Sequence, residues 1–556
     1  MEIYLPAHAN ALNSAGQLYD VRTFGNVSLL HFTDCHAQLL PMYYREPSIN
    51  LGVGSGEGKA PHLVGVPLLE AYGIKAGSRH AYAYSHLDFS ALARAYGKVG
   101  GFAHLASLVK RLKASRPNAL LLDGGDSWQG SATALWTAGQ DMVDASLALG
   151  VDVMTGHWEF THGAKRVLDV VRNDFKDKLA FIAQNIVYEE DRAESVFDAY
   201  VIREQNGIPV AIIGQAFPYT PLANGARFTP GWEFGIDEER LQAVVDAVRK
   251  KGAQVVVLLS HNGMDIDLKL ASRLCGIDMI LGGHTHDGVP IPSVVKNPAG
   301  LTVVTNAGSH GKFLAVIDFE VKHGRVADYR YRLLPVFSDL LPADPGMQAT
   351  IDRVRAPFES RLQEPIAESQ ALLYRRGNFN GSWDQLIVDA LMQVKDAQIA
   401  FSPGFRWGTT LLPGQMITRE NLMEQTAITY PDTSVAQMTG LEIKQHLEKL
   451  CDKIFNEDPY QHQGGDMVRT GGLVYTCEPG AKINSRISNM MLNDQPIQAS
   501  RSYKVARWGV GNTESGDEPV WDVVEQYLRS GPVAKARAPN VPRLIGVASN
   551  PGFASG

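Results

Sequence analysis

The sequence is poor in cysteine and has no long run of apolar residues. Four cysteines in 556 residues are too few for a disulfide framework, and whether Cys451 and Cys477 pair stays open. Cys35 stands between two candidate metal ligands, where we expect it to pack beside a site. No stretch approaches the roughly 18 apolar residues of a transmembrane helix, so we expect no membrane partner.

The sequence also has no excess of positive charge. Lysine and arginine number 52 against 59 aspartates and glutamates, which gives a formal net charge of -7. A nucleic-acid-binding protein normally carries a basic face, so this balance argues against nucleic acid as the main partner. With 45% hydrophobic and 20% charged residues, the composition is that of a globular protein, and the length predicts two domains.

The N-terminus lacks the charged and apolar regions of an export signal. Residues 5–11 nevertheless have the small-x-small spacing of a signal-peptidase site. Two interpretations stay open, namely the remains of a removed export signal and an ordinary flexible start. We treat residues 1–26 as an N-terminal extension.

Five polar clusters each follow an apolar run. They are Asp34-Cys35-His36, Gly125-Asp126, Gly156-His157-Trp158-Glu159, Ser260-His261-Asn262 and Gly282-Gly283-His284-Thr285-His286. Because a parallel sheet gathers the C-terminal ends of its strands along one edge, we expect the clusters to converge. Carboxylate and imidazole donors without cysteine suit Mn²⁺, Fe or Zn²⁺. The sequence therefore predicts a dinuclear metal centre, with Asp126 as the candidate bridge.

Strands and helices alternate through the first half of the chain. The pattern predicts helices over residues 101–113, 141–149, 163–172, 237–251 and 265–273, and strands over 119–122, 151–154, 179–183, 208–213, 254–259 and 277–281. This alternation is typical of an α/β domain with right-handed crossovers. Residues 301–334 predict further strands, which we expect to complete the second sheet of the first domain.

The predicted domain boundaries follow from this pattern. Residues 27–340 form the catalytic domain, residues 341–363 a connecting helix, and residues 364–556 a second α/β domain. Residues 41–98 form a long insert with six tyrosines and no sustained period. A connection of this length is usually functional or disordered, and its aromatic content argues against disorder. We expect a lid or docking surface near the metal edge; the alternative is an ordinarily packed loop.

The metal motifs resemble those of the calcineurin-like metallophosphoesterases, and the C-terminal half resembles their 5′-nucleotidase branch. The resemblance implies an N-terminal four-layer α/β/β/α sandwich followed by a 5′-nucleotidase-type α/β domain. It also implies two ligand sets that share Asp126. One ion would be held by Asp34, His36, Asp126 and His286, and the other by Asp126, His157, His261 and His284.

The sequence departs from the nucleotidases at two motifs. Nucleotidases have Gly-Asn-His-Glu-x-Asp, in which His assists the leaving group and Asp orients that His, whereas this chain has Gly156-His157-Trp158-Glu159-Phe160-Thr161. Trp158 cannot transfer a proton and Thr161 cannot replace the carboxylate, although His162 is a candidate substitute acid. Where nucleotidases have Asn-Gly-Gly-Gly-x-Arg, this chain has Ser402-Pro403-Gly404-Phe405-Arg406.

Both departures, together with segments 31–39, 45–50 and 465–469, closely resemble the SoxB family of thiosulfohydrolases. The resemblance implies a periplasmic enzyme with two Mn²⁺ ions, zinc or iron not being excluded, that cleaves a cysteine S-thiosulfonate on the SoxYZ carrier and releases sulfate. Expelling an alkoxide requires an acid, whereas a persulfide leaves easily, so loss of the histidine acid fits a sulfur leaving group. The alternatives are a 5′-nucleotidase or related phosphoesterase, and an inert metal-binding partner of a carrier complex.

The same reasoning assigns roles to residues around the metals. We expect Asp126, His157 and Arg406 to be catalytic, and Arg406, Arg469 and Trp158 to contact the substrate. Arginine suits anion recognition because its planar guanidinium donates two parallel hydrogen bonds. The alternatives are ordinary surface arginines and a tryptophan that only packs.

Overall fold

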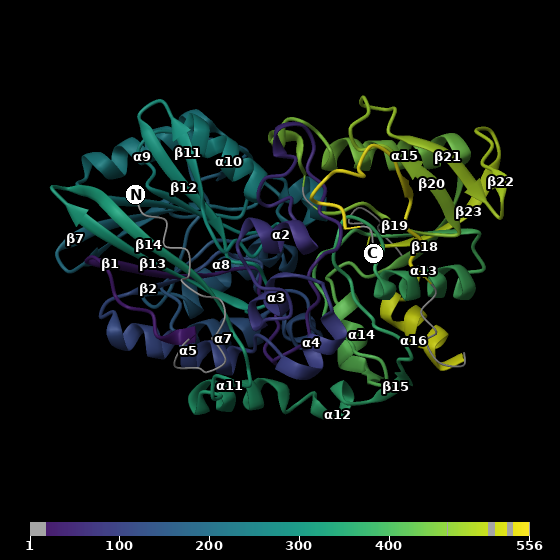
Figure 1. Ribbon diagram of the computed structural model, residues 1–556, viewed down its shortest axis with the longest axis horizontal. Helices are drawn as coiled ribbons and strands as arrows, with labels where there is room; N and C mark the ends of the chain where they lie inside the picture. Colours follow the sequence, from purple (N-terminus) through teal and green to yellow (C-terminus); the bar gives the residue numbers. More distant parts are fainter. Residues whose placement is uncertain (1–17, 464, 510–516, 531–537, 555–556) are drawn as a thin grey trace.

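The structure is a computed structural model that describes residues 18–463, 465–509, 517–530 and 538–554. The N-terminal motif at residues 5–11 lies outside the described residues. Figure 1 shows two halves side by side, with the N-terminal half in purple to teal and the C-terminal half in green to yellow. Among the described residues, no helix is both long enough and apolar enough to cross a membrane.

The N-terminal half is built from two six-stranded sheets. The first has the order β14 (Arg325–Pro335), β13 (Phe313–Lys322), β1 (Val27–Phe32), β2 (Leu120–Asp123), β3 (Val153–Met154), β4 (Ala180–Phe181). The second has the order β11 (Ser293–Asn297), β12 (Gly300–Asn306), β10 (Met279–Gly282), β9 (Val255–Ser260), β7 (Ile208–Gln215), β6 (Tyr200–Gln205). Strands β1, β2 and β3 run parallel, as do β7, β9, β10 and β12, so each sheet gathers strand ends at one edge.

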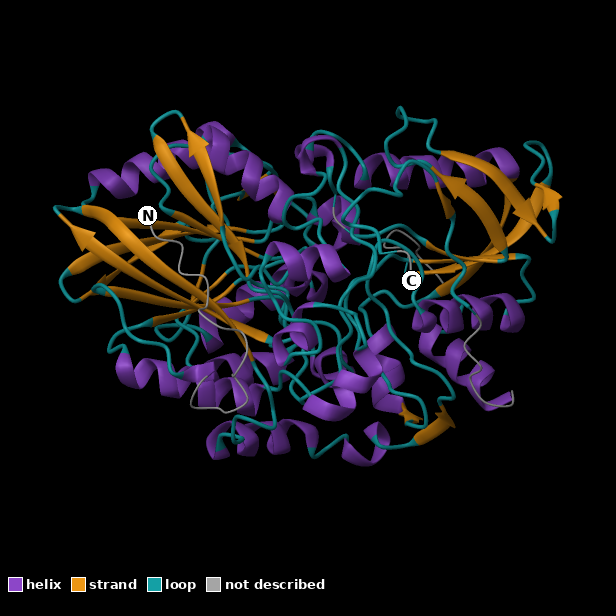
Figure 2. Ribbon diagram, in the orientation of Figure 1, coloured by secondary structure: helices purple, strands orange, loops and turns teal. Residues whose placement is uncertain are grey.

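Strand β9 shows how the sheets and helices form four layers. Alternate residues Val255, Val257 and Leu259 belong to the core between the two sheets. The intervening Val256 and Leu258 pack in a separate cluster with apolar residues of α9 (Glu238–Lys250) and α10 (Met264–Arg273). Helices α5 (Phe102–Ser115) and α7 (Gln140–Leu149) lie on the other side of the stack (Figure 2). A strand buried on both faces is expected in such a sandwich, and the predicted α/β/β/α class is confirmed.

The placement of residues 301–334 was predicted only in part. Strand β12 joins the second sheet beside β10, as expected. Strand β13 instead pairs antiparallel with β1, with Leu29 opposite Ile317, and β14 pairs with β13, so both complete the first sheet. The prediction was wrong for these two strands because both sheets offer an open edge, and the hydrophobic pattern of β13 fits either one.

The C-terminal half contains two four-stranded sheets. One has the order β18 (Thr433–Thr439), β23 (Ser502–Trp508), β16 (Ile399–Ser402), β19 (Arg469–Gly471). The other has the order β22 (Gln495–Pro496), β21 (Ile487–Leu492), β20 (Leu473–Cys477), β24 (Arg543–Leu544). Helices α13 (Ser382–Val394), α14 (Arg419–Thr426), α15 (Gly440–Ile454) and α16 (Val520–Ser530) pack around them. The segment expected as one connecting helix contains two, α11 (Pro345–Arg355) and α12 (Glu359–Leu362).

The insert at residues 41–98 packs between the two halves. It contains the short helices α2 (Gly65–Ala71), α3 (Arg79–Tyr84) and α4 (Phe89–Tyr96), which lie near the centre of Figure 1. Tyr43 forms a β-bridge with Thr410, and Ile49 forms one with Phe553. The insert therefore ties the N-terminal half to the C-terminal half. Its role as a lid or docking surface stays a prediction.

Candidate metal centre

The seven predicted metal ligands follow the C-terminal ends of five strands and meet at one place. Two groups of donor atoms form there, and within each group the atoms lie within 4.8 Å of one another. One group is Asp34, His36, Asp126 and His286, and the other is His157, His261 and His284; all seven side chains are buried. The structure thus brings the predicted set together, while the role of each residue as a ligand stays a prediction.

Asp126 lies between the two groups. Its Oδ2 is 3.5 Å from His36 Nε2 in the first group. The same oxygen is 3.3 Å from His157 Nδ1 and 3.6 Å from His261 Nε2 in the second. One carboxylate therefore faces donors of both groups, which is the position that a bridging ligand occupies.

The backbone around these residues is strained. Five of the seven have positive φ angles, namely Asp34 (52°), His36 (47°), Asp126 (63°), His284 (69°) and His286 (60°). Non-glycine residues rarely adopt this region, and each instance costs on the order of 1–3 kcal/mol. Gly125 is required at φ 91°, because a Cβ there would lie 2.8 Å from the carbonyl oxygen of Thr155. Such clustering of strain is typical of functional sites.

Backbone carbonyls orient two of the imidazoles. His261 Nδ1 donates to the carbonyl of Gly124 at 2.7 Å, and His36 Nδ1 donates to that of Gln129 at 3.3 Å. In both rings Nε2 then faces the donor groups. Asp34 is fixed in turn by the Thr33 hydroxyl at 2.5 Å and by the His284 amide at 3.0 Å. Partners of this kind hold the ligands of metal sites in place.

Glu159 is a positioning residue that the sequence analysis did not assign. Its fully buried carboxylate accepts hydrogen bonds from the amides of Asp126 (3.2 Å), Ser127 (2.6 Å) and His157 (2.7 Å). It therefore joins two predicted ligands through their backbones. The sequence could have indicated this role, because Glu159 belongs to the polar cluster Gly156-His157-Trp158-Glu159.

His310 was also missed. Its ring centroid lies 5.4 Å from that of His36 and 5.9 Å from that of His286. Its Nε2 accepts the amide proton of Gly408 at 3.3 Å, which connects a loop of the C-terminal half to this group of imidazoles.

The electrostatics of the centre favour a neutral imidazole at His157, His284 and His286, a protonated His261 and an ionised Asp126. Burial lowers the pKa of His157 to about 4 and that of His284 and His286 well below the usual range. Burial also disfavours the charged form of His261, but the carboxylates of Asp34 and Asp126 outweigh it and raise that pKa to about 9. Although burial opposes ionisation of Asp126 too, His36 and His157 hold its pKa well below the usual range.

The residues present fit a pair of metal ions. Several buried atoms have no hydrogen-bond partner among the described residues: Asp126 Oδ1, the Nε2 atoms of His157 and His261, and both ring nitrogens of His284. Leaving such atoms unpaired is costly in a protein interior. Carboxylates and imidazoles that face one another in this way are the donor set of Mn²⁺, Fe and Zn²⁺ sites.

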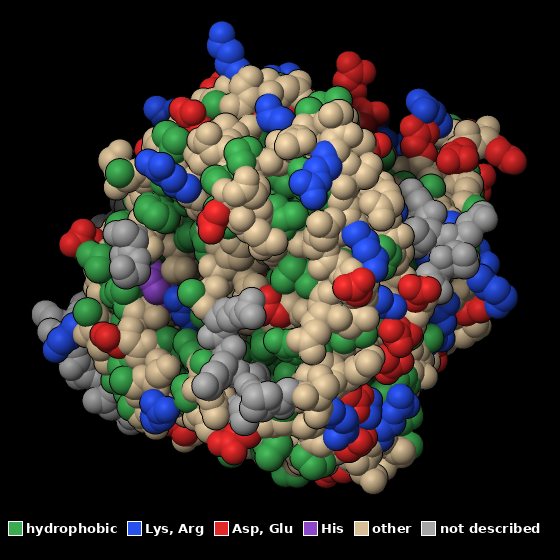
Figure 3. All heavy atoms as spheres, turned by 90° about the vertical axis from the view of Figure 1, so that its right-hand side faces the viewer, with side chains coloured by type: hydrophobic (Ala, Val, Ile, Leu, Met, Phe, Trp, Pro, Cys, Tyr) green, Lys and Arg blue, Asp and Glu red, His purple; other side chains and the backbone are tan. Residues whose placement is uncertain are grey.

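A cavity of about 440 Å³ opens onto this centre between the two halves. The N-terminal half contributes Asp126, His157 and Trp158, and the C-terminal half contributes Arg406 and Lys453. Figure 3 shows the face of the C-terminal half, where basic and acidic side chains are interspersed and a histidine is visible inside a hollow. The cavity gives a solute access to the candidate ligands.

Trp158 belongs to an aromatic cluster at the boundary of the halves. Its ring lies edge-on to Phe405 (5.4 Å) and Trp407 (5.1 Å) and stacks on Tyr430 (5.9 Å). It is 6% exposed and lines the cavity, so it both packs and faces the site. His162 does not line the cavity, and its Nε2 donates to the carbonyl of Trp128 at 3.1 Å.

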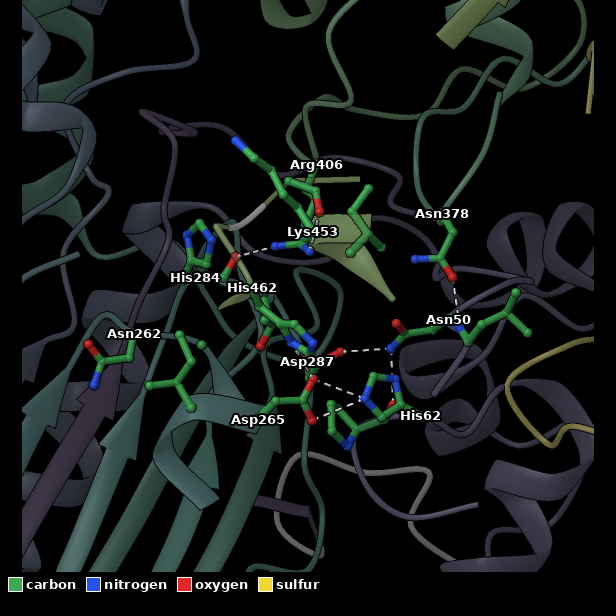
Figure 4. A pocket seen from close by; sticks show the side chains of 17 residues that line it. Asn50, His62, Asn262, Asp265, His284, Asp287, Asn378, Arg406, Lys453 and His462 are labelled. Carbon is green, nitrogen blue, oxygen red and sulfur yellow. Dashed lines mark hydrogen bonds and ion pairs between the residues drawn. The ribbon is translucent and has the colours of Figure 1, made fainter. Parts of the chain in front are cut away.

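Arg406 lies near the candidate ligands, as expected. It donates to the carbonyls of His284 (3.2 Å) and Gly465 (2.9 Å), and its Nε is 3.5 Å from Asp466 Oδ1. It lines both the main cavity and a second one of about 60 Å³, in which His62 contacts Asp265 (Figure 4).

Arg469 lies in the interior of the C-terminal half, and its predicted contact with the substrate stays a prediction. Its side chain is fully buried and does not line the cavity. Its guanidinium lies 3.3 Å from Asp466 and 3.5 Å from Asp384 and donates to the carbonyl of Gly377. Two buried carboxylates thus hold Arg469 in the interior.

Lys453 lines both cavities in its place. Its ammonium has no ion-pair partner among the described residues. The sequence analysis gave no signal for it, since nothing in α15 distinguishes one lysine from the next.

The chain was compared with protein families and known proteins. Residues 367–522 match the model of the 5′-nucleotidase C-terminal domain. The bovine 5′-nucleotidase is 26% identical over 335 residues, 55% of this chain and 56% of that enzyme, so the match spans about half the length of that relative. The human 5′-nucleotidase is 24% identical over 503 residues, covering 79% and 85%.

The solved structures decide the family. The sulfate thiohydrolase SoxB of Thermus thermophilus, in complex with glycerol, is 36% identical to this chain, covers 95% of it and 98% of the other chain, and gives a TM-score of 0.89. The chain belongs to the SoxB family. A 5′-nucleotidase precursor from Thermus thermophilus, 21% identical with a TM-score of 0.73 over 94% of this chain and 99% of its own, shares the fold.

Proposed function

We propose that this chain is a periplasmic dimetal hydrolase that cleaves an S-thiosulfonate on a cysteine of a SoxYZ carrier and releases sulfate. The observation that carries the proposal is Trp158. A side chain that cannot donate a proton takes the position of the nucleotidase acid, in an aromatic cluster that lines the cavity beside the candidate ligands. The similarity to a sulfate thiohydrolase supports the same reaction class.

The reaction is a hydrolysis at sulfur. The oxygen of water bonds to the sulfonate sulfur as the adjacent S–S bond breaks, and the electron pair of that bond leaves with the sulfur that stays on the carrier cysteine. The products are sulfate, a cysteine persulfide and a proton. Because a persulfide anion is a far better leaving group than an alkoxide, no acid at position 158 is needed.

The metal site is proposed to hold two Mn²⁺ ions, with zinc or iron as alternatives. Asp34, His36, Asp126 and His286 would hold one ion and Asp126, His157, His261 and His284 the other. Two divalent ions in such a site supply a lowered pKa for water and neutralise anionic oxygens. Glu159 keeps Asp126 and His157 in register through their backbone amides.

The cavity walls provide recognition. Arg406 and Lys453 place positive charge beside the candidate ligands and favour an anionic substrate. Phe405, Trp407 and Trp158 form an aromatic surface that suits a thin peptide segment. A carrier arm that bears the thiosulfonate would fit between the two walls.

The proposal is tested with two substrates at the same Mn²⁺ concentration. We expect sulfate release from the S-thiosulfonate carrier and little turnover of a nucleoside monophosphate. Fast nucleotide turnover with none of the carrier would favour the phosphoesterase alternative. Tight carrier binding with no sulfate release by metal-loaded protein would favour the inert partner.

A further inference from the structure

Two of the four cysteines are in contact in the C-terminal half. Cys451 lies on α15 and Cys477 ends β20, and their Sγ atoms are 3.5 Å apart. Both side chains are fully buried and belong to the same apolar cluster. Cys35 and Cys275 lie elsewhere, the first buried beside the metal centre and the second half-buried after α10.

The backbones that carry the two thiols are well fixed. Cys477 pairs with Ile487 on one side and with Leu544 on the other, and its carbonyl accepts the amide of Ile545. Cys451 is held in the last turn of α15, where its carbonyl accepts the amide of Phe455. A disulfide has an Sγ–Sγ distance of about 2.0 Å, so the sulfurs need to approach by about 1.5 Å.

We propose that Cys451 and Cys477 form a disulfide bond in the folded protein. Each thiol loses its proton, and the pair gives two electrons to a disulfide oxidant such as glutathione disulfide, which leaves as two thiols. The bond forms during folding, while the thiols are accessible. In the folded reduced chain the neighbouring Cys477 and burial raise the pKa of Cys451 well above its usual range, and protonated thiols exchange slowly.

The bond would fix one wall of the cavity. Helix α15 carries His446, Leu450 and Lys453, all of which line the main cavity. The chain between the two cysteines carries Asp466, the carboxylate that faces Arg406. A link between positions 451 and 477 therefore holds the helix and both ends of this segment together. This inference does not depend on the reaction that the site performs.

The first experiment counts thiols. The full chain is unfolded, refolded in a mixture of reduced and oxidised glutathione, and denatured in iodoacetamide without reductant. We expect two alkylated cysteines, Cys35 and Cys275, and a cross-linked 451–477 peptide that disappears on reduction. Four alkylated cysteines, or a link between any other pair, would overturn the proposal.

The second experiment measures the effect of the bond on stability. Under oxidising conditions the double variant Cys451→Ser/Cys477→Ser should melt several degrees below the parent, since a disulfide that closes such a segment restricts the unfolded chain. Cys275→Ser is the matched control and should melt with the parent. Most of the difference should disappear when the parent is reduced. A double variant as stable as the oxidised parent, with an unchanged reduced parent, contradicts a bond. If the double variant does not fold, the thiol count on the parent still decides.

Discussion

The two walls of the cavity hold their polar groups in different ways. On the N-terminal wall the side chains follow strand ends, are buried, and in five of seven cases stand on positive-φ backbone. On the C-terminal wall Arg406 and Lys453 are partly exposed, and the stacked rings of Phe405 and Trp407 line the same cavity. The first arrangement holds buried donor atoms close together, and the second presents charge and apolar surface. The difference suggests that chemistry belongs to the first wall and recognition to the second.

The strongest test of the role of the N-terminal wall is to remove the carboxylate of Asp126, which faces both donor groups. In Asp126→Ala we expect both ions to be lost or weakened together, with sulfate release reduced by about a thousandfold or more, since the oxygen that faces both donor groups is gone. Metal content and rate are measured together. Glu239→Ala, an exposed change on α9, is the control. Two ions at full occupancy in Asp126→Ala would refute the bridging assignment.

Two arginines of the C-terminal half, one at the cavity and one in the interior, should separate recognition from stability. Arg406→Met should lower kcat/KM for the carrier by roughly tenfold to a hundredfold, with little change in melting temperature, because the side chain is partly exposed beside the site. Arg469→Met should mainly destabilise, by about 1.5–3 kcal/mol, because the buried Asp466 and Asp384 each lose one of their two cationic partners. Rates and denaturation curves distinguish the two. A stable Arg469→Met with weakened carrier binding would support the predicted contact of Arg469 with the substrate.

Arg469 also shows which features of the site could not be predicted from the sequence. All seven candidate ligands could be located from the sequence, because each lies in a polar cluster that follows an apolar run. Such a run is a local pattern that predicts a strand, and a parallel sheet brings the C-terminal ends of its strands to one edge. The burial of Arg469 depends on Asp384 and Asp466, one of them 85 positions away in the chain, and no local pattern reports such a pairing. Tertiary packing likewise decides that β13 pairs with β1 in the first sheet and that the side chain of Lys453 lines the cavity.

A smaller effect concerns the proton on His261. Its folded pKa of about 9 exceeds the unfolded value near 6.5, so in metal-free protein its stabilising contribution is complete below about pH 6.5 and is lost as pH rises through 9. We expect the metal-free melting temperature to fall between about pH 7.5 and 9.5. A ligand must be neutral, so metal uptake near pH 7.5 should release a proton.

Calorimetry in buffers of different ionisation enthalpy measures that proton. Metal-free His261→Gln is the comparison and should show a flatter stability profile over the same window. Burial raises the pKa values of Asp123 and Asp267 to about 7, so these two groups titrate mostly below the window of pH 7.5 to 9.5. An identical slope in parent and variant would show that His261 is not the group responsible.

The smallest expected effect is an unchanged rate of sulfate release when an acid is restored at position 158. The double change Trp158→His/Thr161→Asp restores the nucleotidase acid and its orienting carboxylate. If a persulfide leaves without an acid, the variant should release sulfate no faster, while its activity on an activated aryl phosphate should rise. Steric loss is the main confounder, because Trp158 packs against Trp407 and Tyr430 and its truncation leaves a cavity worth a few kcal/mol. Trp158→Phe serves as the packing control, and melting temperature and metal content are measured beside each rate. A stable, two-metal double variant that releases sulfate a hundredfold faster would correspond to about 2.7 kcal/mol of transition-state stabilisation. It would show that acid catalysis limits the parent and that Trp158 is not matched to a sulfur leaving group.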